Sequence, residues 1–133
     1  MTGVFADTFY FLALLNPADD AHAAASNFAG DRTLRLITTA WVLTELADGL
    51  ASTLGRTVFR TLLDELEADD RAEIVPATPG LWDRGVHLYA DRPDKEWSLT
   101  DCISFVVMTD RGLRDALTAD RHFEQAGFAA LLK

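Results

Sequence analysis

Residues 116–120 read Ala-Leu-Thr-Ala-Asp, a short apolar run that an acidic residue closes. The same arrangement appears near the start of the chain, where Val4-Phe5-Ala6 is followed by Asp7. Short apolar runs of this kind are typical of strands that are buried on both faces, as in parallel sheets. The two runs therefore predict buried parallel strands that each end close to a carboxylate.

The rest of the chain alternates between such runs and helical patterns, which indicates an α/β fold with a mainly parallel sheet covered on both faces. Strands are expected at residues 4–6, 34–37, 72–75 and 116–118, with a further edge strand at 128–132. Helices are expected at 8–15, 18–28, 39–52, 57–68 and 98–109, from Pro79 up to the polar loop 91–96, and as a short turn at 122–125, with a break at Leu54-Gly55.

Composition limits the class of protein. The 133 residues fit one domain over residues 1–133, and the formal net charge of −9 argues against simple nonspecific nucleic-acid binding, which needs Lys and Arg. The single cysteine, Cys102, is expected to be a buried structural thiol in a reducing compartment. No signal peptide and no apolar run of roughly 18 residues is seen, so a cytoplasmic protein that does not enter a membrane is expected.

Four acidic residues lie at the junctions of the predicted elements: Asp7, Glu45, Asp101 and Asp120. Sites in α/β folds form outside the carboxyl ends of parallel strands, so these side chains are expected to converge. Converging carboxylates repel one another unless a cation holds them together, and Mg²⁺ or Mn²⁺ suits oxygen ligands. The pattern predicts a metal-dependent enzyme.

Each acid also has an ordinary structural interpretation. Asp7 and Asp120 could cap the helices that follow them, and Ser98 with Asp101 fits a capping box. Glu45 lies inside a helix, where it cannot be a cap but could be a solvated position. Three caps and one helix-interior Glu beside strand ends would be a coincidence if unrelated, so the joint pattern favours a shared site.

Four segments, taken in order, resemble PIN-domain ribonucleases, and most of all the VapC-type toxins of bacterial toxin–antitoxin pairs. They are Phe-Ala-Asp-Thr at 5–8, the helix 39–50 with Thr-Glu-Leu at 44–46, Ser-Leu-Thr-Asp-Cys-Ile-Ser-Phe at 98–105, and Ala-Leu-Thr-Ala-Asp-Arg-His-Phe-Glu-Gln-Ala-Gly-Phe at 116–128. The last two segments are the specific ones. The resemblance implies a single PIN domain over residues 1–133, a three-layer α/β/α sandwich around a short, mainly parallel sheet.

The same resemblance implies an endoribonuclease that uses Mg²⁺ or Mn²⁺ to hydrolyse RNA phosphodiester bonds. Its catalytic acids, which also hold the metal, would be Asp7, Glu45, Asp101 and Asp120. Asp7 and Asp101 are expected to be the central ligands, while Glu45 and Asp120 could reach the ion through water.

Further residues are assigned around these acids. The hydroxyls of Thr8, Ser104 and Thr118 are expected to orient the carboxylates by hydrogen bonding. Arg121 is expected to contact the RNA backbone and Trp97 to stack on a base. His122 could also touch the RNA backbone, but it is expected to be a surface or partly packed residue that supports Phe123.

Partners follow from the resemblance as well: an RNA substrate, a cognate antitoxin that holds the toxin inactive, and a second copy in a homodimer. The apolar faces of residues 8–15 and 39–52 could form the antitoxin groove or simply belong to the core. Two alternatives stay open, a PIN-type nuclease in housekeeping RNA processing and a PIN-like scaffold that no longer cleaves. Acids at all four positions weigh against the scaffold.

Overall fold

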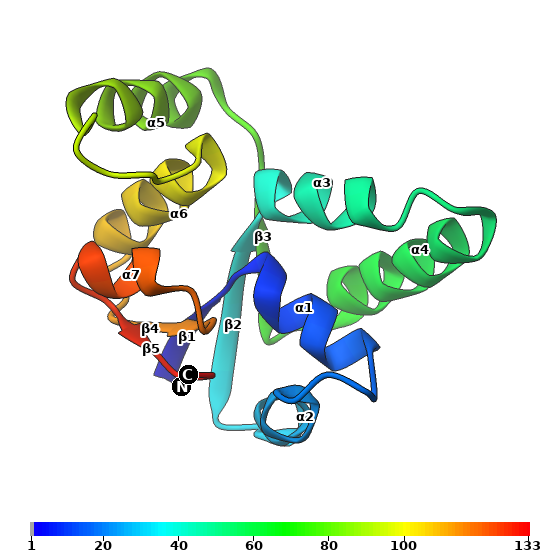
Figure 1. The fold of residues 1–133 in the computed structure, drawn as a ribbon. Helices are drawn as coiled ribbons and strands as arrows, with labels where there is room; N and C mark the ends of the chain where they lie inside the picture. The colour runs from blue at the N-terminus through cyan, green and yellow to red at the C-terminus, as the bar shows by residue number, and fades with distance from the viewer. Residues whose placement is uncertain (1) are drawn as a thin grey trace.

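A parallel five-stranded sheet lies at the centre of the fold (Figure 1). The computed structural model describes residues 2–133, so Met1, where the expected domain begins, lies outside the described residues. The strands follow the order β3-β2-β1-β4-β5, and neighbouring strands are parallel. Their bounds are β1 (Thr2–Ala6), β2 (Leu34–Thr39), β3 (Ala72–Val75), β4 (Asp115–Leu117) and β5 (Ala129–Ala130).

Helices cover both faces of the sheet, as the alternation in the sequence predicts. Figure 1 shows α1, α2 and α4 on one side of the strands and α5, α6 and α7 on the other, and α3 contacts both groups through α1 and α6. The bounds are α1 (Thr8–Leu15), α2 (His22–Gly30), α3 (Ala40–Gly49), α4 (Thr53–Ala68), α5 (Pro79–Asp91), α6 (Leu99–Asp110) and α7 (Arg121–Gln125). Within residues 2–133, no helix combines the length and apolar character needed to cross a membrane.

The second helix starts later than predicted, because two side chains hold the preceding residues in turns. A helix is expected at 18–28, whereas α2 begins at His22. Asn16 and Asp19 each accept a hydrogen bond from the backbone N–H two residues further on, at 3.0 and 2.8 Å. Such bonds compete with helical hydrogen bonding. The alanine-rich composition therefore predicts the helix but not its first turn.

The break between α3 and α4 lies before the predicted Leu54-Gly55. α3 ends at Gly49, and α4 begins at Thr53 with Ser52 as its N-cap. The Ser52 hydroxyl oxygen accepts a hydrogen bond from the Gly55 N–H at 3.0 Å, which places Gly55 inside the helix. The other predicted elements agree with the structure to within about two residues, which is the usual uncertainty of element ends.

The register of β1 brings two strand ends to the same edge of the sheet. Ala6 pairs with Leu117 of β4, so the residues that follow, Asp7 and Thr118, lie side by side. On the other side of β1, the Thr38 hydroxyl donates a hydrogen bond to the Ala6 carbonyl oxygen at 2.9 Å. The backbone that precedes Asp7 is therefore fixed from both neighbouring strands.

Aromatic rings fix α6 and α7 to the sheet. Phe105 of α6 packs edge-to-face against Phe123 of α7 with ring centroids 5.0 Å apart, and Phe123 packs against Phe5 of β1 at 6.3 Å. Phe5 and Phe123 are fully buried. Burial of each such ring contributes roughly 2–3 kcal/mol. These contacts set the positions of the two helices that border the acidic residues.

Helices α5 and α6 approach each other closely at Gly85. A Cβ atom on Gly85 would overlap Cγ1 of Ile103 in α6. Near the same contact, Arg84 donates two hydrogen bonds to the Asp110 carboxylate, at 2.6 and 2.8 Å. The absence of a side chain at position 85 therefore sets the distance between these helices.

The Gly85→Ala variant is expected to lower the free energy of unfolding by about 1–3 kcal/mol, because the added methyl group overpacks the α5–α6 contact. Gly80→Ala on the same helix is the matched control, since nothing lies within 4 Å of its added Cβ. The control is expected to be neutral or to raise stability by up to about 1 kcal/mol. Urea unfolding of both variants measures this, and equal stabilities would contradict the close contact.

Candidate active site

One open hollow beside the carboxyl ends of β1 and β4 is lined by all four acids that the sequence singles out. Asp7 follows β1, Asp120 follows β4, Glu45 comes from α3 and Asp101 from α6. Asp7 and Asp101 are buried, with exposed fractions of 5% and 8%, whereas Asp120 is half-buried and Glu45 is exposed. The fold thus brings together side chains that are spread over most of the chain.

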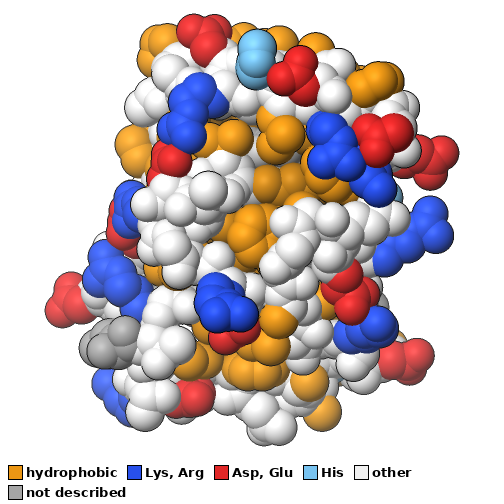
Figure 2. All heavy atoms as spheres, turned by 90° about the vertical axis from the view of Figure 1, so that its left-hand side faces the viewer, with side chains coloured by type: hydrophobic (Ala, Val, Ile, Leu, Met, Phe, Trp, Pro, Cys, Tyr) orange, Lys and Arg blue, Asp and Glu red, His pale blue; other side chains and the backbone are white. Residues whose placement is uncertain are grey.

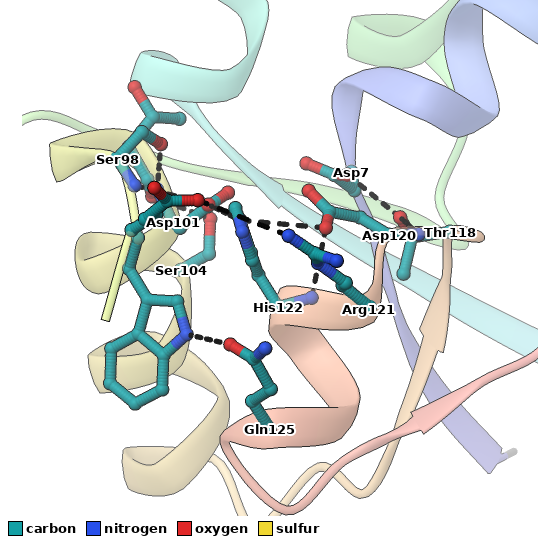
Figure 3. Close-up of polar contacts among 12 residues, drawn as sticks. Asp7, Ser98, Asp101, Ser104, Thr118, Asp120, Arg121, His122 and Gln125 are labelled. Atoms are coloured by element: carbon teal, nitrogen blue, oxygen red, sulfur yellow. Dashed lines mark hydrogen bonds and ion pairs between the residues drawn. The ribbon is translucent and has the colours of Figure 1, made fainter. Parts of the chain in front are cut away.

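Two threonine hydroxyls engage one oxygen of Asp7 and one of Glu45. Thr118 Oγ1 donates to Asp7 Oδ2 at 3.0 Å (Figure 3), and Thr8 Oγ1 donates to Glu45 Oε1. Thr118 Oγ1 also accepts a hydrogen bond from the Asp120 N–H at 3.1 Å. Both threonines therefore make the contacts expected of hydroxyls that orient carboxylates. Asp7 precedes α1 but makes no side-chain cap for it, so the capping interpretation does not describe Asp7.

Helix caps engage one oxygen of Asp101 and one of Asp120. Asp101 Oδ2 accepts from the Ser98 N–H at 3.2 Å, and Ser98 Oγ accepts from the Asp101 N–H at 3.0 Å, which completes a capping box. Asp120 Oδ1 accepts from the His122 N–H at 2.9 Å and caps α7. The capping interpretation is right for these two residues. A carboxylate has two oxygens, so a cap leaves one of them for a ligand.

His122 also enters the site, where the sequence predicts a surface or packing role. Its Nδ1 lies 3.1 Å from Asp101 Oδ2 and 3.5 Å from Asp120 Oδ1 (Figure 3). The available signal is its position two residues after a helix-capping aspartate. That signal does not show that α6 lies close enough for the ring to reach Asp101.

Two residues assigned to the site from the sequence have other partners. Ser104 donates its hydroxyl hydrogen to the Thr100 carbonyl oxygen at 2.9 Å, so this donor is not available to a carboxylate. Trp97 is only 6% exposed, and its Nε1 donates to Gln125 Oε1 at 3.0 Å. Trp97 and Phe105 line a separate hollow between α5, α6 and α7. Base stacking requires an exposed ring, which this structure does not present at Trp97.

Arg121 remains at the rim of the acidic hollow. Its side chain is 73% exposed, and its Nη2 lies 3.9 Å from Oε2 of Glu96, which lines the hollow. Such an exposed ion pair contributes little stability. The guanidinium group is therefore available to a phosphate that approaches the acids.

Comparison with known proteins identifies the family of this chain. The chain matches the PIN domain family over residues 4–129. This protein belongs to the PIN-domain family. It is 29% identical over 126 residues to the 23S rRNA-specific endonuclease VapC20 of Mycobacterium tuberculosis, which covers 94% of this chain and 95% of that protein.

Solved structures agree with the PIN-domain assignment. The crystal structure of Mycobacterium tuberculosis VapC20, described as a sarcin–ricin loop cleaving toxin, has a TM-score of 0.81 at 24% identity, covering 95% of this chain and 96% of that one. FitAcB from Neisseria gonorrhoeae has a TM-score of 0.65 at 20% identity, covering 96% of this chain and 94% of that one. These likenesses confirm the predicted PIN-like α/β/α fold.

Burial dominates the electrostatics of this PIN-domain site. Burial raises the pKa of Asp7 to about 7; the Thr118 hydrogen bond opposes this rise, and the negative charges of Asp101 and Glu45 add to it. Burial also raises the pKa of Asp101, while the hydrogen bond from His122 lowers it. No Lys or Arg among residues 2–133 contributes to lowering the pKa of Asp7. A bound cation would therefore relieve the site.

The donor atoms suit a divalent metal ion. Oxygens of Asp101 and Asp120 lie within 4.8 Å of each other, and a ring nitrogen of His122 lies within the same distance of both. In each of the four carboxylates a hydrogen bond from the fold engages one oxygen and leaves the second for a ligand. Oxygen-rich sites of this kind favour hard divalent ions over soft ones. The residues present therefore fit the metal that the PIN-domain resemblance implies.

The metal-free protein is expected to lose stability as the pH rises from about 4 to about 7. The folded-state pKa of Asp7 is raised, so the stability linked to its protonated form is present below its unfolded pKa of 3.8 and is lost as the pH passes about 7. At pH 8, the free energy of unfolding of Asp7→Asn should therefore exceed that of wild type by up to about 4 kcal/mol. Urea unfolding in EDTA at a series of pH values measures the difference.

The matched control for this experiment is Asp48→Asn, which removes the same charge from an exposed position of α3. It is expected to follow wild type at every pH. If Asp7→Asn and Asp48→Asn have the same free energy of unfolding at pH 8, the buried charge of Asp7 does not destabilise the folded protein as expected.

Proposed function

We propose that this protein is a metal-dependent endoribonuclease of the VapC toxin type, which hydrolyses RNA phosphodiester bonds with Mg²⁺ or Mn²⁺. The observation that carries the proposal is the hollow in which Asp7, Glu45, Asp101 and Asp120 each keep one oxygen available for a ligand. The name of the relative VapC20, an endonuclease matched over nearly the whole chain, supports it. Four intact acids favour this function over a non-cleaving scaffold.

The role that we propose for each residue follows from its burial. A divalent ion at the site would lower the pKa of water and offset charge on the phosphate. Asp7 and Asp101, the most buried acids, are the central ligands, while Glu45 and Asp120 lie nearer to solvent and contact the ion directly or through water. Thr118 fixes the Asp7 carboxylate before substrate arrives, so little reorganisation is needed.

RNA must approach a protein with a formal net charge of −9. Figure 2 shows that Lys and Arg side chains and acidic ones are interspersed on the α5–α7 face, without one continuous basic surface. Attraction is therefore local, from the metal ion and from Arg121 at the rim of the hollow. Arg121 is the residue that we assign to the RNA backbone.

An antitoxin and a second copy of the chain are the proposed protein partners, in the cytoplasm. Phe9 and Leu12 of α1 line the hollow beside the acids, and Leu12 is 42% exposed, which suits an apolar antitoxin segment. Trp82, Val86 and Tyr89 are exposed on α5 at helical spacing, which supports a dimer contact.

RNA cleavage by purified wild type and Asp7→Asn tests the proposed function. The probes are an RNA oligonucleotide that contains the 23S rRNA sarcin–ricin loop, after the relative VapC20, and an unrelated single-stranded RNA. Wild type should cut with Mg²⁺ or Mn²⁺ and stop in EDTA. Asp7→Asn should lose about 100-fold or more, because a missing ligand removes several kcal/mol of charge stabilisation.

Asp48→Asn serves as the control and should cut as wild type does. If wild type cuts neither RNA with either metal, while a partner protein still binds, the non-cleaving scaffold replaces the nuclease as the best interpretation.

Metal binding should also stabilise the folded chain in a pH-dependent way. At pH 8, millimolar Mn²⁺ is expected to raise the Tm by several degrees, because the ion binds ionised carboxylates of the folded state. At pH 5 the rise should be much smaller, since Asp7, with a pKa of about 7, is protonated there. Thermal scans with and without Mn²⁺ at the two pH values, and with Asp7→Asn, measure this; an equal rise in Asp7→Asn would argue against Asp7 as a ligand.

A further inference from the structure

His122 stands between two acids of the site. Its Nδ1 is 3.1 Å from Asp101 Oδ2 and 3.5 Å from Asp120 Oδ1. Ionised carboxylates only accept hydrogen bonds, so Nδ1 must carry the hydrogen. The ring N–H therefore bonds to Asp101 and lies close to Asp120, two acids that come from different helix starts (Figure 3).

The ring is itself held by its neighbours. The His122 backbone N–H donates to Asp120 Oδ1 at 2.9 Å as part of the α7 cap. The next residue, Phe123, is fully buried against Phe105 of α6. The imidazole is only 19% exposed. Its position is thus determined by the cap and by the core.

Asp101 depends on this N–H for its orientation. Its Oδ2 accepts two hydrogen bonds, from the Ser98 N–H at 3.2 Å and from His122 Nδ1 at 3.1 Å. Two donors on one oxygen fix the plane of the carboxylate and leave Oδ1 for a ligand. With the Ser98 bond alone, the carboxylate could rotate about its Cβ–Cγ bond.

We propose that His122 is a positioning residue of the metal centre, whose Nδ1–H fixes the carboxylate of Asp101 beside that of Asp120 so that their remaining oxygens bind one divalent ion. The proposal rests on the metal-dependent function proposed above. Hydrogen-bond donors to metal ligands set ligand orientation, and their loss costs about 10- to 100-fold in metal affinity.

Three substitutions at His122 distinguish the role of its Nδ1–H from the role of the imidazole ring itself. In His122→Asn an amide N–H lies close to the position of Nδ1, whereas in His122→Gln it lies close to that of Nε2. His122→Phe keeps a ring without a donor. We expect His122→Asn to keep near wild-type affinity for Mn²⁺ and the other two to lose about 10- to 100-fold. His87→Asn, at a side chain that is 81% exposed on α5, is the control and should bind as wild type does.

Titration of the full-length chain with Mn²⁺, read as free Mn²⁺ by electron paramagnetic resonance, measures these affinities. Metal-free urea unfolding of each variant checks that the fold is kept. Unchanged Mn²⁺ affinity in His122→Phe would overturn the proposal. So would an equal loss in His122→Asn and His122→Phe, because it would mean that the imidazole itself binds the metal or packs the site.

Nitrogen-15 NMR of the metal-free wild type gives an independent readout. We expect the His122 ring to carry hydrogen on Nδ1, and a ring protonated on Nε2 alone would overturn the proposal. A wild type that binds Mn²⁺ but cuts no RNA contradicts the ribonuclease proposal alone. Metal-dependent cleavage with unchanged affinity in His122→Phe contradicts the His122 proposal alone.

Discussion

The burial of Asp7 is the constraint around which the site is arranged. Asp7 is 5% exposed, and its carboxylate lies near Asp101 and Glu45 and receives a hydrogen bond from Thr118. A buried charge is unfavourable unless it is paired or fully hydrogen-bonded. The described chain offers this group neutral donors, the Thr118 hydroxyl and the Thr8 backbone N–H, and the remaining cost appears as a pKa of about 7. The site is therefore short of positive charge until a cation binds.

Strand pairing and helix capping place the other residues of the site around the buried Asp7. Parallel pairing of β1 with β4 brings Thr118 beside Asp7, and helix capping fixes Asp101 and Asp120 at the first turns of α6 and α7. The first turn of a helix already favours negative charge. The same bonds that begin the helices therefore also orient the proposed metal ligands, so folding and preorganisation of the site depend on the same contacts.

The features of the fold and site that the sequence predicts are those with local signals in the chain. The parallel α/β fold and the placement of Asp101 and Asp120 follow from short apolar runs and capping residues, which act over a few positions. Two differences, at Trp97 and His122, depend on contacts between distant segments, whereas the difference at Ser104 is local. Trp97 is buried because α6 packs against α7, and His122 reaches a residue 21 positions away. Ser104 lies on the expected face of α6, but its own helix takes up the hydroxyl hydrogen.

The pairing of β1 with β4 also orders events during synthesis. A ribosome releases the chain from its N-terminus, and domains fold as their segments emerge. Asp7 gains its Thr118 hydrogen bond only after Asp115–Leu117 has emerged, and Asp120 follows later still. The acidic centre thus stays incomplete until nearly all of the described chain has been made. Until then the nascent chain lacks the complete set of acids that the proposed nuclease activity requires.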